Sequence, residues 1–87
     1  MIHNIYSVRD NIAEQFMGGF ESVNDGTAIR AFKDACNDEN QLGKNASDYT
    51  LFKVAKFDDV SGEYWNDKHK LQDGKRKVQP PETVVTI

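Results

Sequence analysis

The side chains best suited to chemistry gather near the end of the sequence, in the stretch WNDKHKLQDGKRKVQPP at residues 65–81. Five of the eleven Lys and Arg residues fall within residues 68–77, close to an adjacent tyrosine and tryptophan. Lysine and arginine neutralise backbone phosphates, and exposed aromatic rings stack on unpaired bases. This composition predicts weak binding of single-stranded nucleic acid. The predicted contact residues are Tyr64, Trp65, Lys68, Lys70, Lys75, Arg76 and Lys77.

The same stretch is also typical of a charged, solvated loop. In that interpretation Trp65 packs beneath a sheet, and the lysines discourage neighbouring molecules from pairing edge to edge. The whole chain is acidic, with a net charge of −3, although residues 68–87 carry +3 and residues 1–67 carry −6. Overall acidity argues against tight binding to duplex DNA. Composition alone leaves both interpretations open.

Catalysis has little support in the sequence. His3 and His69 lie in unrelated local contexts, and neither has a neighbour that suggests a nucleophile paired with a base. The glycines of FMGGF, at residues 16–20, lack the lysine and the serine or threonine of a phosphate-binding loop. We therefore expect a protein that is not an enzyme and that uses no cofactor or small-molecule substrate.

Metal binding is also poorly supported. Four carboxylates crowd one predicted hairpin, but their spacing does not follow the alternation of a calcium loop. They are Asp58, Asp59, Glu63 and Asp67. The single cysteine, Cys36, cannot form a disulfide within the chain and supplies too few ligands for a zinc site. We expect a solvated acidic turn, a small buried thiol and no metal.

The first half of the sequence predicts a strand, a bent arm and a helix. Residues 2–9 are rich in β-branched and aromatic side chains, which favours a strand. Residues 13–23 surround Gly18–Gly19 and predict a second strand, or an extended arm that bends at the glycines. Residues 25–37 place apolar side chains at the i, i+3, i+4, i+7 spacing of an amphipathic helix, with an N-cap offered by residues 24–26.

The second half predicts further strands around a polar segment. Residues 49–57 are apolar on both faces, which is typical of a central strand. The Asp-rich turn at residues 58–62 should lead to a returning hairpin strand at residues 63–65. The basic segment from about residue 66 to residue 79 is predicted as a loop that could be flexible. Residues 83–87 predict an optional terminal strand.

Together these elements predict a single α+β domain spanning residues 1–87. A small, mostly antiparallel sheet should pack on one amphipathic helix, in the order β-β-α-β-β. No apolar run approaches the roughly 20 residues that cross a bilayer, and the N-terminus lacks the basic start and apolar stretch of a signal peptide. We therefore expect no membrane contact and a location in the cytoplasm.

Four motifs, in order along the chain, resemble a known family. They are IYSVRD at residues 5–10, FMGGF at 16–20, NDGTAIRAFKDACND at 24–38 and SDYTLFKVAKFDDVSG at 47–62. The sequence resembles the small nonstructural proteins of gokushoviruses, which are described as DNA-binding. Gokushoviruses are tailless single-stranded-DNA phages of the microvirus group. The resemblance covers residues 1–62. It does not extend to the basic segment, and Gly18–Gly19 stand where prolines are common in the family.

The resemblance implies a role inside an infected bacterium, in handling the phage genome during replication or packaging. Arg9 and Arg30 are lone cations within the motifs and join the predicted DNA contacts, whereas the motif aromatics are expected mainly in the core. The alternative is a homodimeric protein-interaction module that docks on the phage replication or assembly machinery without touching DNA. That module would use Phe16 and Phe20 of the arm, or an exposed strand edge.

Overall fold

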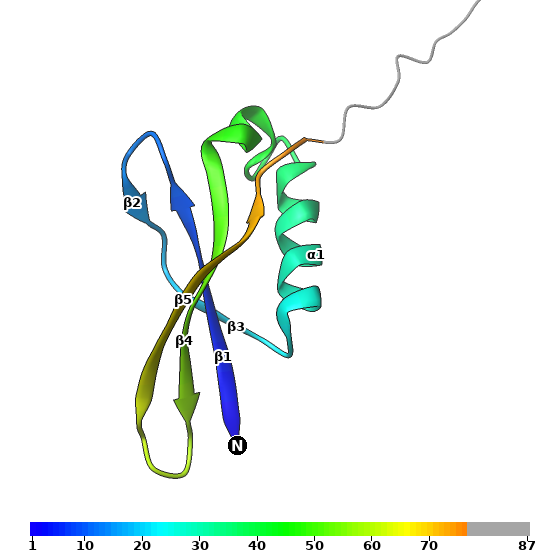
Figure 1. Cartoon of the computed structure of the whole chain (residues 1–87). Coiled ribbons are helices and arrows are strands. Elements are labelled where there is room, and N and C mark those ends of the chain that lie inside the picture. The colour runs from blue at the N-terminus through cyan, green and yellow to red at the C-terminus, as the bar shows by residue number, and fades with distance from the viewer. Residues whose placement is uncertain (77–87) are drawn as a thin grey trace, which may run out of the picture.

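The structure of the protein, a computed structural model, describes residues 1–76 (Figure 1). Lys77 and the predicted strand at residues 83–87 lie outside the described residues. Within the described part, one main helix packs against one antiparallel sheet, which confirms the predicted α+β class. No helix in residues 1–76 is long and apolar enough to cross a membrane.

The sheet contains five strands, with β1 and β4 at its centre. Its hydrogen-bonded order is β2-β1-β4-β5, and β3 pairs with the same central strand as β2, so the two short strands share one edge. The strands are β1 (Ile2–Asp10), β2 (Gln15–Phe16), β3 (Phe20–Ser22), β4 (Tyr49–Asp58) and β5 (Tyr64–Asp73). The opposite edge of the sheet is formed by β5.

The predicted bent arm corresponds to β2 and β3, which are separated by Met17 and the glycine pair. The backbone N–H of Met17 donates to the Val8 carbonyl at 2.8 Å, and the Ser7 hydroxyl donates to the Met17 carbonyl at 2.6 Å. These bonds hold the bend of the arm against β1. The arm therefore forms part of the sheet, as an interrupted edge strand.

Helix α1 (Asp25–Cys36) begins at the predicted cap, where the Asn24 side chain accepts a hydrogen bond from the Thr27 N–H at 2.9 Å. Its residues Ala28, Phe32 and Cys36 are buried and recur every four positions, so they form one face. This face packs with Tyr6 and Leu51 of the sheet in the hydrophobic core. The helix confirms the prediction for residues 25–37 to within one residue, because Asn37 is its C-cap.

An ionic network around the buried Lys53 joins the start of α1 to the sheet. The Lys53 ammonium lies 3.3 Å from an Asp67 oxygen and 4.0 Å from an Asp25 oxygen, and Lys53 is only 8% exposed. The Tyr6 hydroxyl donates to Asp25 at 2.7 Å. Burial, and then the bond to Asp25, raise the pKa of Tyr6, while the Lys53 ammonium lowers the pKa of Asp67. The network thus links the first residue of α1 to β1, β4 and β5.

Strand β5 is longer than predicted. The sequence indicated that the returning strand ends at Trp65 and that a loop follows, but β5 continues to Asp73. Its later residues are almost all polar, which resembles a loop, yet they pair with β4 in the register His69 with Lys53 and Lys70 with Phe52. An edge strand needs few apolar residues, because much of its surface faces water. The early part of the basic segment therefore has fixed, alternating side-chain directions.

Candidate nucleic-acid interface

The sheet has two unlike faces, one covered by α1 and one without a helix (Figure 1). Residues directly opposite each other in antiparallel strands point to the same face. One row of such partners across the strands contains Tyr6, Lys53 and His69, and it points to the helix side because Tyr6 contacts α1. The next row of partners along the strands points to the opposite face of the sheet. We call the side without a helix the open face; its residues include Ser7, Arg9, Phe16, Phe52, Tyr64, Lys68 and Lys70.

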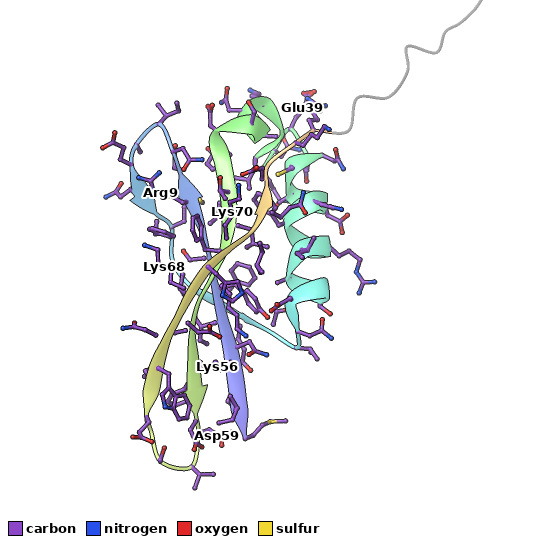
Figure 2. The ribbon with its side chains drawn as sticks, in the orientation of Figure 1. Arg9, Glu39, Lys56, Asp59, Lys68 and Lys70 are labelled. Atoms are coloured by element: carbon purple, nitrogen blue, oxygen red, sulfur yellow. The ribbon has the colours of Figure 1, made fainter. Side chains whose placement is uncertain are left out.

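A cluster of rings and cations occupies the half of the open face nearest the arm. The rings of Phe16 and Phe52 meet edge to face with centroids 5.2 Å apart, and the Lys68 ammonium lies 5.3 Å from the Phe16 centroid. Arg9 is the register partner of Phe16, and Lys70 is that of Phe52. Figure 2 shows Arg9 and Lys68 on the side of the sheet that faces away from α1. Three strands and the arm thus bring these residues together.

A chain of hydrogen bonds runs across one end of this cluster. Arg9 Nη1 donates to Asn11 Oδ1 at 2.7 Å, and Asn11 Nδ2 donates to Thr50 Oγ1 at 2.9 Å. The Thr50 hydroxyl donates at 3.5 Å to Asp73, which also accepts from Lys70 Nζ at 3.2 Å. The three cations of the open face consequently differ in the groups that they contact. Arg9 contacts a neutral amide, Lys70 contacts a carboxylate, and Lys68 has no carboxylate partner within residues 1–76.

Tyr64 and Trp65, predicted to act together, lie on opposite faces of the sheet. Tyr64 is opposite Phe57, their ring centroids are 4.5 Å apart, and Tyr64 is 67% exposed. Trp65 is opposite Lys56, is 41% exposed, and lines a shallow hollow of about 440 Å³ with Ile2. Tyr64 therefore shares the open face with Lys68 and Lys70, and Trp65 does not.

The remaining predicted cations lie away from the open face. Arg30 is exposed on α1, about 200° around the helix from the buried Ala28, so it points away from the sheet. Lys75 follows β5, and its backbone N–H donates to the Cys36 thiol on the helix side. Arg76 pairs with Glu39 at 3.3 Å. The structure thus brings Arg9, Lys68 and Lys70 together and separates them from these three.

The two residues predicted for protein docking also differ in their surroundings. Phe20 packs against Tyr6 with ring centroids 5.8 Å apart and is half-buried, so it belongs to the edge of the core. Phe16 is 38% exposed and lies in the open-face cluster. Sequence reasoning did not connect Phe16 with the lysines. Its alignment with Arg9 depends on the turn between β1 and β2, which no periodic pattern reveals.

The opposite end of the sheet carries a histidine held by carboxylates. His3 Nδ1 contacts Glu21, and its Nε2 lies 2.7 Å from Asp59, which also binds the Met1 amino group at 2.8 Å. The bonds to Asp59 and then to Glu21 raise the pKa of His3. Both ring nitrogens are engaged, so neither is free to take a proton from a substrate. Within residues 1–76, no group of three or more His, Cys, Asp or Glu side chains is arranged to hold a metal ion.

The protein combines an α+β fold, in which α1 is the one α-helix of the described residues, with a cationic, aromatic sheet face. Residues 3–75 match the family described as Phage ORF5 protein, and the chain therefore belongs to that family. The matched range includes β2 to β5, all of β1 except Ile2, and every open-face residue named above. No curated protein and no solved structure matches the chain.

Proposed function

We propose that this phage protein binds single-stranded DNA weakly and without sequence preference, in the cytoplasm of the infected bacterium, during replication or packaging of the genome. One observation carries the proposal: the Lys68 ammonium lies over the Phe16 ring, at 5.3 Å from its centroid. A cation beside an exposed ring offers partners for the two parts of an unpaired strand, its phosphates and its base faces. The resemblance of residues 1–62 to gokushovirus proteins supports a virus with such a genome.

The open face suits an unpaired strand better than a duplex. Phe16 and Tyr64 each present an exposed ring, and the bases of a duplex are already stacked on one another. Tyr64, Lys68 and Lys70 point to the same face of β5 and span about 20 Å at the rise of an extended strand. This distance accommodates several phosphates. Lysine contacts to phosphate carry no sequence information, so the proposed binding is not sequence-specific.

The proposed role is that of an accessory binding protein, with no catalytic step. His3 is held by two carboxylates, and His69 contacts Asp67 through Nδ1 at 3.6 Å on the helix side of the sheet. The His69 side chain points away from the open face, and His3 lies at the other end of the sheet from Lys68 and Phe16, where the strand would be bound. Arg30, Lys75 and Arg76 are left out of the proposed contact set because they lie away from the open face.

Charge reversal on the open face tests the proposal. Fluorescence anisotropy with a labelled oligothymidylate of about twelve nucleotides, at low salt, measures binding. Lys68→Glu combined with Lys70→Glu should abolish the anisotropy change. The matched control, Arg30→Glu with Lys33→Glu on α1, alters the net charge equally and should bind nearly as the unmodified protein does. Equal losses in both variants, or no binding by the unmodified protein, would overturn the proposal.

A second proposed function rests on the apolar surface of the arm. Ile12 is 75% exposed and Met17 is 48% exposed, and both lie close in sequence to the partly exposed Phe16. Exposed apolar residues that form one contiguous patch are typical of protein-docking surfaces. The arm could join two copies of the chain, or dock on the phage replication or assembly machinery. Light scattering after size exclusion would then show a dimer that Ile12→Ser with Met17→Ser converts to a monomer, and a monomer throughout would count against self-association.

A further inference from the structure

One carboxylate lies within the cationic part of the open face. Asp73 is the last residue of β5 and the register partner of Thr50, which is the register partner of Arg9. Its Oδ2 accepts from Lys70 Nζ at 3.2 Å, and its Oδ1 accepts from the Thr50 hydroxyl at 3.5 Å. The carboxylate of Asp73 thus places a negative charge beside Lys70, a proposed phosphate contact.

The Lys70–Asp73 pair is weak enough to open. The Lys70 side chain is 58% exposed and that of Asp73 is 69% exposed. Ion pairs with this exposure contribute little net free energy, because water and salt screen them. A DNA phosphate can therefore take the Lys70 ammonium from Asp73. The displaced carboxylate stays attached to β5, where it repels the next phosphate of the strand.

The backbone after Asp73 leaves the open face. The Gly74 N–H donates to the Tyr49 carbonyl at 2.7 Å, and a Cβ at Gly74 would lie 1.9 Å from the Ala46 carbonyl oxygen. No other residue type fits that approach without displacing backbone. The chain continues on the helix side, where the backbone N–H of Lys75 donates to the Cys36 thiol. Asp73 therefore lies between the cations of the open face and those that follow in the sequence.

We propose that Asp73 is an internal competitor of phosphate that sets the affinity of the open face for single-stranded DNA and marks one end of the bound segment. This inference rests on the proposed function. In the free protein Asp73 neutralises Lys70 and leaves Arg9 and Lys68 for the first contact. In the complex a phosphate replaces Asp73 at Lys70. Such competition keeps binding weak and reversible, as is needed for a protein that must later release the genome.

Asp73→Asn tests the competition, because it keeps the shape of the side chain and removes its charge. Binding to oligothymidylate should become about two- to five-fold tighter, corresponding to the loss of one exposed ion pair. The slope of log affinity against log salt concentration should also become steeper by up to about 0.7, the contribution of one further released counterion. Asp34→Asn on the outer side of α1 changes the net charge equally and should have a much smaller effect on both quantities.

A double-mutant cycle separates competition from a structural role. In a Lys70→Ala background, Asp73→Asn should lose most of its effect on affinity, because there is no ammonium left to release. An effect of Asp73→Asn that is unchanged by Lys70→Ala, or one no larger than that of Asp34→Asn, would overturn the inference while leaving DNA binding itself intact. Absence of binding by the unmodified protein would overturn both the inference and the proposed function.

Discussion

Tyr64 and Trp65 are neighbours in the chain, yet their side chains point to opposite faces of the sheet. Tyr64 stacks on Phe57 on the open face, whereas Trp65 lies opposite Lys56 on the helix side. The alternation of a β-strand requires this separation. A single strand of DNA on the open face can therefore reach one of these rings and not the other.

The separation predicts unequal effects of two alanine substitutions. Tyr64→Ala should weaken binding of oligothymidylate by about 1 kcal/mol or more, because a ring that stacks on a base is lost. Trp65→Ala should leave the affinity nearly unchanged. Anisotropy titrations measure both, and circular dichroism checks that each variant is folded. Loss of binding in Trp65→Ala alone would place the DNA on the other face.

The number of cations on the open face predicts the salt dependence. Arg9 and Lys68 should give a log–log slope of about −1.4, since each neutralised phosphate of a single strand contributes about 0.7 and the contribution of Lys70 is offset by Asp73. Lys68→Ala should reduce the slope to about −0.7. Titrations between about 50 and 200 mM NaCl measure the slope. A slope that Lys68→Ala leaves unchanged would exclude Lys68 as a phosphate contact.

The contacts of His3 predict how stability depends on pH. Asp59 and Glu21 raise the pKa of His3, so its contribution is fully present below the unfolded-state value of about 6.5 and is lost as the pH rises through the higher folded value. The pKa of Asp59 is lowered by His3, so the contribution of Asp59 is lost only as the pH falls into the acid range. The free energy of unfolding should therefore decline on the alkaline side.

Urea unfolding from about pH 5 to pH 9 measures this dependence. His3→Gln should flatten the alkaline decline in part, because the imidazole is gone while the Met1 amino group, whose pKa the bond to Asp59 also raises, still titrates. Asp59→Asn should flatten it in part, since Glu21 remains beside His3. If His3→Gln has the same pH profile as the unmodified protein, the imidazole does not make these contacts in solution.

The sequence was a good guide where local pattern decides structure. The apolar spacing in residues 25–37 and the cap at Asn24 predicted α1 closely, and the glycine pair correctly predicted an interrupted arm. The burial of Cys36 also followed from its place on the apolar face of that helix. In these cases the periodicity of the side chains reports directly which side of an element is buried.

Which residues share the open face depends on the pairing of strands, and local sequence pattern does not reveal that pairing. Residues 66–73 resembled a loop because an edge strand tolerates polar side chains, and only the ladder to β4 shows that they form a strand. Phe16 meets Lys68 because β1 and β4 lie between their strands and fix both registers. Long-range register of this kind is set by the whole sheet.

The most direct test of DNA binding on the open face is an NMR titration of the ¹⁵N-labelled protein with oligothymidylate at low salt. We expect the largest changes in backbone amide shift at Phe16, Phe52, Lys68 and Lys70, with little change along the exposed side of α1. Changes confined to α1 or to the hollow beside Trp65, or no changes at all, would contradict binding at the open face.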